Sequence, residues 1–174
     1  GMTCNTTFIK QWKRNWMQVE LTPTEVMVAS WYGCQRRVNA IKQGRRNRFG
    51  NADHRVGRAA WGLDVEGAAA EMAAAKVLQR YMPFTIGDTK DDDLNGIHVR
   101  STPYATGHLI VYDDDPDDAP FVLMVGVLPS FKAAGWTLAS DAKQQQWLDE
   151  QGGQYWVPQD QLRSIDVLRG MYGA

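Results

Sequence analysis

The dipeptide Asn95-Gly96, set between Leu94 and Ile97, constrains the fold of this chain more than any other feature of its 174 residues. Asn-Gly flanked by apolar residues is the strongest short-range signal for a two-residue hairpin turn, because both turn positions require a positive φ. The sequence therefore predicts a β-hairpin in which Leu94 pairs with Ile97 and the second strand runs to Thr102.

Strand alternation then predicts which side chains share one face of this hairpin. Directly opposite residues have Cβ atoms about 5 Å apart, so Asp93 would face His98, and Asp91 would face Arg100. His98 and Arg100 lie two residues apart and point to the same side. An acid, an imidazole and a guanidinium are thus expected on one patch. The plain alternative is two exposed cross-strand ion pairs, worth under about 1 kcal/mol each.

A first helix is predicted over residues 22–44. Thr22 can cap its start, Pro23 suits the first helical position, and Glu25 completes a capping box with Thr22. Gly33 is the interior residue that opposes this helix, because glycine has low helix propensity.

A second helix is predicted over residues 65–81, centred on the alanine-rich segment 68–76. Helical spacing places Glu71 on the same stripe as Ala74 and Leu78, so a carboxylate would lie on a small, apolar face. Alanines on that face would let the helix approach a sheet closely.

Further elements follow the hairpin. The continuous apolar run 120–127 favours a strand buried on both faces. The acidic run 113–118 lacks the glycine and terminal glutamate of a calcium-binding loop, so a solvated turn is expected there. The other predicted strands are 108–112, 131–138 and 155–157, and the other predicted helices are 140–148 and 158–168. This order is typical of an α/β (α+β) protein with a mixed central sheet flanked by helices.

The segment Ile97-His98-Val99-Arg100-Ser101-Thr102, preceded by Asp93, resembles the hairpin of the restriction-endonuclease-like, or PD-(D/E)XK, nuclease superfamily. In that superfamily a strand-borne Asp precedes a strand of the type Ile-Glu-Val-Lys-Ser/Thr-Thr. The resemblance covers about residues 64–138 and implies an α-β-β-β-α-β core. The chain would then be one compact domain with a basic helical extension over residues 1–60 and a nuclease-like core over residues 61–174.

The same resemblance implies a catalytic group made of Glu71, Asp93, His98 and Arg100. The superfamily's first core helix often carries an acid aimed at a metal, and Glu71 matches that position, with Glu66 as the alternate. Glu71, Asp93 and His98 would bind a divalent metal, Mg²⁺ or Mn²⁺. No other cofactor is expected.

Two positions depart from the superfamily's pattern. His98 stands where a Glu is usual, which removes a hard ligand and shifts the preference toward Mn²⁺ or other transition metals. Arg100 stands where a Lys is usual. It can bind a phosphate through two hydrogen bonds, but it does not readily exchange a proton. The sequence therefore leaves two alternatives open, an active nuclease and an inactive nuclease-fold protein.

The charge distribution favours a nucleic-acid partner. Residues 1–60 carry 11 basic and 3 acidic residues, a net charge of +8, while the rest of the chain carries 8 basic and 17 acidic residues. Neutralisation of one region by the other is the alternative reading. The candidate residues for binding DNA or RNA are Arg36, Arg37, Lys42, Arg45, Arg46 and Arg48.

The remaining patterns add little chemistry. Cys4 and Cys34 form no disulfide framework or metal-ligand spacing, and Cys34 falls at apolar helical spacing, as expected of a buried structural thiol. His108 is expected to be structural and His54 solvated. No apolar run approaches the roughly 20 residues that span a bilayer, so we expect no membrane association and a cytoplasmic location.

A third functional class is a protein-binding accessory. The whole chain, including Leu21-Thr22-Pro23-Thr24-Glu25 and Val157-Pro158-Gln159, looks like a set of phage and prophage proteins. This likeness names no activity. It implies a phage or host protein as a possible partner and, for a phage-encoded chain, the host cytoplasm as the location.

Overall fold

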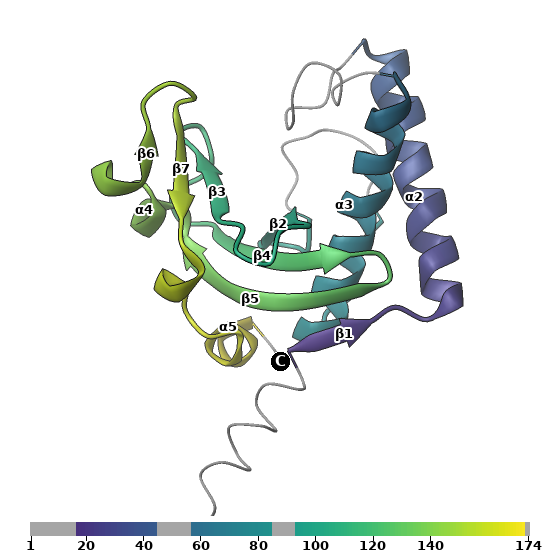
Figure 1. Cartoon of the computed structure of the whole chain (residues 1–174). Helices are drawn as coiled ribbons and strands as arrows, with labels where there is room; N and C mark the ends of the chain where they lie inside the picture. Colours follow the sequence, from purple (N-terminus) through teal and green to yellow (C-terminus); the bar gives the residue numbers. More distant parts are fainter. Residues whose placement is uncertain (1–16, 45–56, 85–92, 173–174) are drawn as a thin grey trace, which may run out of the picture.

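The predicted capping box starts the first long helix of the computed structural model, which describes residues 17–44, 57–84 and 93–172 (Figure 1). The Glu25 N–H donates to the Thr22 hydroxyl, and the Thr22 N–H donates to the Glu25 carboxylate at 2.7 Å. Helix α2 then runs over Pro23–Lys42, so the predicted helix is confirmed.

The second predicted helix is also confirmed, but it is longer at its start. Helix α3 spans Gly57–Leu78. It begins before residue 65 because Ala60 is buried and Asp64 forms an ion pair with Arg37 of α2 at 3.2 Å. It ends before the predicted limit because Gln79 adopts a positive φ of 55°, which is incompatible with a continuing helix.

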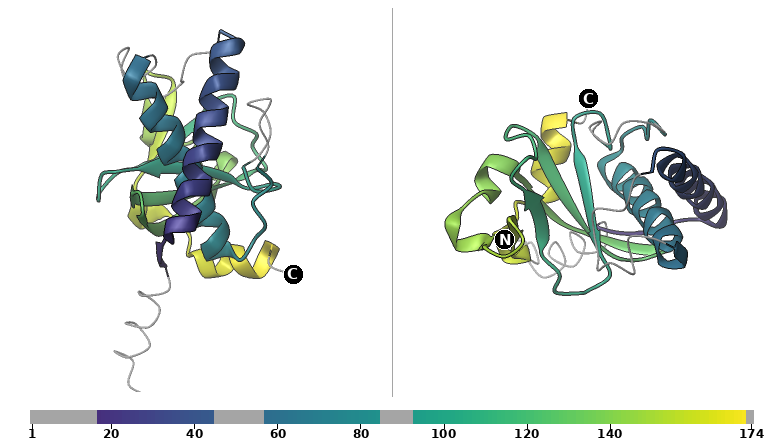
Figure 2. Two further views of the ribbon diagram at one scale, coloured as in Figure 1. Left: turned by 90° about the vertical axis from the view of Figure 1, so that its right-hand side faces the viewer. Right: turned by 90° about the horizontal axis from the view of Figure 1, so that it is seen from above.

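Gly33 allows α2 and α3 to pack closely. The two helices lie side by side in all three views (Figures 1 and 2). A Cβ on Gly33 would lie 2.5 Å from the Cα of Val65 and 2.6 Å from the carbonyl oxygen of Asp64. The glycine that weakens α2 as a helix is therefore what lets α3 approach it.

Four strands form a mixed sheet beside α3. They are β1 (Gln18–Glu20), β2 (His98–Thr102), β4 (Pro120–Val127) and β5 (Ser130–Leu138). Their order is β1-β5-β4-β2, with β2 parallel to β4 and the other neighbours antiparallel. The predicted strands 120–127 and 131–138 are confirmed, and the first half of β4 is buried on both faces as expected.

A second, three-stranded sheet has the order β3-β7-β6 and is antiparallel. It lies on the far side of the four-stranded sheet from α2 (Figure 1). Its strands are β3 (Leu109–Tyr112), β7 (Gln154–Val157) and β6 (Leu148–Asp149), which include two predicted strands. The described strands thus form two sheets rather than one central sheet, within the expected mixed α and β class.

Two hydrophobic clusters hold these layers together. The first joins the alanine face of α3, from Ala68 to Ala75, to one face of β4 through Val122 and Met124. The second joins the other face of β4, through Phe121 and Leu123, to the three-stranded sheet. Two buried side chains of α2, those of Ala29 and Tyr32, belong to the first cluster, so α2 shares the core of the segment predicted to start at residue 61.

The predicted hairpin is only half correct. Its turn is confirmed, because Asn95 and Gly96 have φ values of 49° and 97° and the Leu94 N–H donates to the Ile97 carbonyl at 3.0 Å. Asp93 lies in that turn and not opposite His98 on a strand.

The Asp93 carboxylate explains the difference. It accepts a hydrogen bond from the Val99 N–H at 2.7 Å, so the side chain takes up a backbone group that a partner strand would need. Strand β2 pairs instead with β4, in parallel. Asp91, predicted to face Arg100, lies outside the described residues.

The two predicted C-terminal helices are interrupted. The first is split into α4 (Ala139–Ala142) and the short 3₁₀ helix η1 (Gln145–Trp147), because Lys143 leaves the helical conformation. The second is split into the 3₁₀ helix η2 (Gln159–Gln161) and α5 (Ile165–Tyr172). There the backbone of Arg163 is held by two hydrogen bonds to Trp136 of β5.

The close helix packing at Gly33 yields a stability prediction. Gly33→Ala places a methyl group against the backbone of α3, and overpacking of this kind costs roughly 1–3 kcal/mol of unfolding free energy. Gly62→Ala is the matched control, because Gly62 also lies in a helix but a Cβ there meets nothing within 4 Å. We expect that control to be neutral or slightly stabilising. Equal urea midpoints for the two variants would contradict the close packing.

Candidate functional site

Glu71 is a carboxylate in the interior of the helical layer. It lies in the middle of α3, where the helix is covered by the sheet and by α2, and only 6% of the residue is exposed. One carboxylate oxygen is ion-paired with the Arg36 guanidinium of α2. The other, Oε2, is buried without a hydrogen-bond partner in the described part of the chain. An unsatisfied buried oxygen is costly, so this atom indicates a place that accepts a proton or a cation.

Arg36 joins three elements at this point. Its guanidinium lies over the ring of Tyr32, 4.5 Å from the centroid, and pairs with Glu71. Its second terminal nitrogen lies 4.0 Å from Asp93 Oδ1. The side chains of Asp93 and Arg36 are 18% and 27% exposed, so the cluster opens to solvent on their side. We call Arg36, Glu71 and Asp93 the carboxylate site.

The electrostatics of the carboxylate site favour a protonated Glu71. Burial, followed by the negative charge of Asp93, raises the pKa of Glu71 from 4.5 to about 8, although Arg36 acts in the opposite direction. Asp93 is also close enough to hydrogen-bond the protonated acid. One guanidinium cannot neutralise two adjacent carboxylates, so at neutral pH the second positive charge comes from a proton.

The same charge deficit fits a divalent cation. Mg²⁺ is commonly held by one or two carboxylates, with waters and substrate phosphates completing its shell. Glu71 and Asp93 supply two such ligands. Within residues 17–44, 57–84 and 93–172, no group of three or more His, Cys, Asp or Glu side chains is arranged to bind a metal. The fit is therefore to two carboxylates, without the predicted third ligand.

His98 is directed elsewhere. Its ring stacks on Phe121 of β4, with centroids 4.6 Å apart and planes 11° from parallel. Phe121 belongs to the cluster between the two sheets, on the opposite face of β4 from α3. The structure therefore joins Glu71 and Asp93 but gives His98 an aromatic partner.

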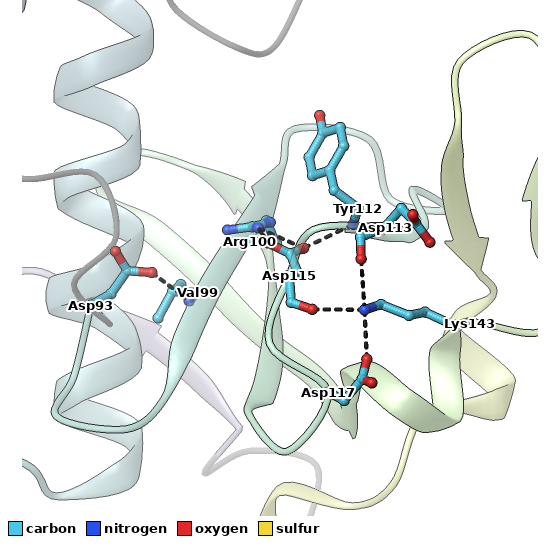
Figure 3. Close-up of polar contacts among 8 residues, drawn as sticks. All are labelled: Asp93, Val99, Arg100, Tyr112, Asp113, Asp115, Asp117 and Lys143. Carbon is cyan, nitrogen blue, oxygen red and sulfur yellow. Dashed lines mark hydrogen bonds and ion pairs between the residues drawn. The ribbon is translucent and has the colours of Figure 1, made fainter.

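Arg100 points to the same face of β2 as His98, as predicted. Its guanidinium lies 4.8 Å from the Phe121 ring centroid and donates to both carboxylate oxygens of Asp115, at 3.1 Å each (Figure 3). Asp115 also accepts from the Tyr112 N–H at 2.8 Å. Arg100 thus anchors the acidic loop that follows β3.

The acidic loop, predicted as a solvated turn, surrounds the ammonium group of a lysine. The Lys143 ammonium donates to the carbonyl oxygens of Asp113 and Asp115 and to the Asp117 carboxylate, at 2.9, 2.7 and 2.6 Å (Figure 3). These three oxygens therefore bind the Lys143 ammonium. The loop is fixed by Arg100 and Lys143 rather than by solvent alone.

The other candidate residues have varied positions. The alternate acid, Glu66, accepts a hydrogen bond from the Leu128 N–H at 3.0 Å, between β4 and β5. Arg37 is buried in its ion pair with Asp64, so Arg36 and Arg37 both act within the fold. Lys42 is exposed at the end of α2. Arg45, Arg46 and Arg48 lie outside the described residues.

Three residues remain from the sequence analysis, namely Cys34, His108 and His54. Cys34 is half-buried rather than fully buried. His108 makes an edge contact with Trp156, with centroids 6.2 Å apart, in keeping with a structural role. His54 lies outside the described residues.

Comparison of the chain with protein-family models, curated proteins and solved structures finds no match. In the described part of the chain, no helix has the length and apolar content needed to cross a bilayer. The structure is thus that of a mixed α and β protein in which one arginine lies between a buried and a partly exposed carboxylate.

The raised pKa of Glu71 predicts a pH-dependent stability. Between pH 4.5 and 8 the folded chain keeps a proton that the unfolded chain has released, so the unfolding free energy contributed by Glu71 falls as the pH rises. Glu71→Gln cannot titrate and serves as the reference. The unfolding free energy of the wild type, relative to that of this variant, should fall by more than about 1.4 kcal/mol across this window, which is the value for one pKa unit.

Urea unfolding at pH 5 and pH 8 measures this difference. Glu150→Gln, at an exposed position, is the control and should follow the wild type. A pH-independent gap between the wild type and Glu71→Gln would show that Glu71 titrates normally.

Proposed function

We propose that this chain is a divergent nuclease-like protein that acts on nucleic acid, in which Glu71 and Asp93 hold one divalent cation against a phosphodiester. The observation that carries the proposal is the buried, unbonded Glu71 oxygen beside a second carboxylate. A purely structural ion pair would need one acid for Arg36, whereas this cluster has two.

The charges of the carboxylate site suit a phosphate. With both acids ionised and Arg36 protonated, the cluster carries one net negative charge, and a bound divalent cation turns this into one net positive charge. That matches a single phosphodiester. A divalent cation there would supply Lewis-acid polarisation of a phosphate oxygen.

The chain's own groups would take the remaining roles. Asp93 and Arg36 form the solvent-facing side of the site, so a phosphate approaching from solvent meets Arg36 first. A guanidinium can bind a phosphate through two parallel hydrogen bonds. Glu71, behind them, would lose its proton when the cation binds. The restriction-endonuclease-like core belongs to this proposal too, supported by the order of α3, the Asp93 turn, β2 and β4.

A second candidate is an inactive nuclease-fold module that binds DNA, RNA or a protein partner. It is favoured by the positions of His98 and Arg100. The two side chains that would assist hydrolysis are stacked on Phe121, and Arg100 also binds Asp115. Such a module would keep the carboxylate site, Arg36 included, for structure and would bind through the part of the basic segment 36–58 that follows Arg37.

The two candidates differ in a cleavage assay. The wild type should nick or degrade supercoiled, linear, single-stranded or branched DNA with Mg²⁺ or Mn²⁺. Asp93→Asn and Glu71→Gln should each lower the rate by at least about 100-fold, because each removes a ligand for the cation.

Asp160→Asn is the matched control, since Asp160 is an exposed acid outside the site. Cleavage by Asp93→Asn at the wild-type rate would rule out the carboxylate site as the catalytic centre. A complete lack of cleavage across the substrates and metals, together with tight binding, would establish the inactive module instead.

Nucleic-acid binding has its own prediction. Affinity for duplex DNA should fall linearly with salt on a double-logarithmic plot, with a slope of about −0.9 per phosphate contact. Replacing Arg45, Arg46 and Arg48 together by alanine should flatten this slope by up to about 3. Lys132→Ala, an exposed lysine on β5, should leave the slope unchanged. Absence of both DNA and RNA binding at low salt would dispose of the nuclease and of the module that binds nucleic acid, and would leave only a module that binds a protein partner.

A further inference from the structure

Helix α2 has two apolar faces on opposite sides. The inner face, with Ala29, Tyr32 and Gly33, is buried against α3. The outer face carries Met27, Trp31, Cys34, Val38 and Ile41, which we call the outer stripe. Three of these side chains are more exposed than buried, namely Met27 at 66%, Trp31 at 58% and Ile41 at 58%. An ordinary surface helix has one apolar face and one polar face, so the outer stripe requires an explanation.

The spacing of the outer stripe indicates a helix as its partner. Its residues follow one another by four, three, four and three positions, which is the heptad pattern of a coiled-coil seam. Seams of this kind pack on a second helix with the same periodicity. The chain itself provides one such helix, which is α2 of another copy.

The position of α2 leaves room for this partner. Figure 2 shows α2 at the outer edge of the molecule, with α3 between it and the sheets. Among the described elements, those packed on α2 lie on its inner side. No charged residue interrupts the outer stripe between Met27 and Ile41, and polar Gln35 and Asn39 lie along its flank. Two stripes could therefore meet without like-charge repulsion.

The area is sufficient for a pair of copies. With Val28, which is 38% exposed beside the stripe, the exposed apolar side chains amount to roughly 500 Å² per copy. Two facing stripes would bury on the order of 1,000 Å², the lower end for a specific interface. The stripe has no cations for a phosphate backbone, so it does not duplicate the proposed nucleic-acid surface.

We propose that two copies of this chain associate through their outer stripes as an antiparallel pair of α2 helices. In a parallel pair each Trp31 would face the other Trp31. An antiparallel pair sets Trp31 against a smaller side chain of the other stripe, and it aligns the helix dipoles favourably. This proposal stands on the exposed stripe and is independent of the carboxylate site.

Sedimentation equilibrium of the full chain tests the proposal. The wild type should show a mass near twice the 19.6 kDa of one chain at 100 μM and dissociate in the micromolar range. Trp31→Lys and Ile41→Lys should each weaken association by at least about 30-fold, the effect of losing a central apolar contact. Both positions are exposed, so the two variants should keep the circular dichroism spectrum and the urea midpoint of the dissociated wild type.

Tyr104→Lys is the matched control, because Tyr104 is 73% exposed and lies outside α2. It should associate as the wild type does. A monomeric wild type at 100 μM would overturn the proposal, and the outer stripe would then be covered by another segment or by a different partner. A dimer that survives both lysine substitutions would overturn it equally, by placing the interface elsewhere.

Discussion

The structure depends on the burial of α3 from two sides. Its alanines lie against the four-stranded sheet, and Gly33 brings α2 against the other side. Small side chains make both approaches possible, because they allow backbones to come close without voids. A polar side chain in the middle of α3 is therefore buried. Only 6% of Glu71 is exposed, and a buried charge is costly unless it is paired.

Arg36 provides that pairing, but only in part. It reaches Glu71 because α2 and α3 are close, and it also attracts Asp93, which the turn at Asn95-Gly96 holds beside β2. Two acids then share one guanidinium. The cluster reaches neutrality by taking a proton on Glu71 or by taking another cation. Protonation favours stability and cation binding favours ionised acids, so stability and the proposed function oppose each other at the same atom.

Local signals were the ones that could be predicted from the sequence. The capping box of α2, the apolar run of β4 and the Asn95-Gly96 turn each depend on a few neighbouring residues, and each is confirmed. The partner strand of the hairpin was wrong because the Asp93 carboxylate, and not a strand, binds the Val99 N–H. The longer helices predicted near the C-terminus were wrong because Lys143 and Arg163 are drawn into contacts with distant segments.

The carboxylate site also depends on contacts between distant segments, which local sequence patterns do not predict. Glu71 and Asp93 were grouped by the family resemblance and not by a local pattern, and the two carboxylates interact in the structure. Arg36 was assigned to nucleic acid, because an arginine in a basic segment has no local pattern that marks a partner 35 residues away. The acidic loop was expected to be solvated for a similar reason, since Lys143 lies 28 residues beyond Asp115. Ion pairs between distant segments are set by packing, which a single sequence does not display.

Helix α2 connects the two surfaces on which function is proposed. Its inner face carries Arg36 to the carboxylate site, and its outer face carries the stripe centred on Cys34. Both surfaces require α2 to be packed on α3, because the Arg36–Glu71 pair crosses between the two helices. The close approach at Gly33 holds α2 against the backbone of Val65, so association at the outer stripe and the carboxylate site are linked only through folding. A partner that binds the outer stripe of the folded chain should therefore raise the unfolding free energy by mass action, without changing the charge state of Glu71.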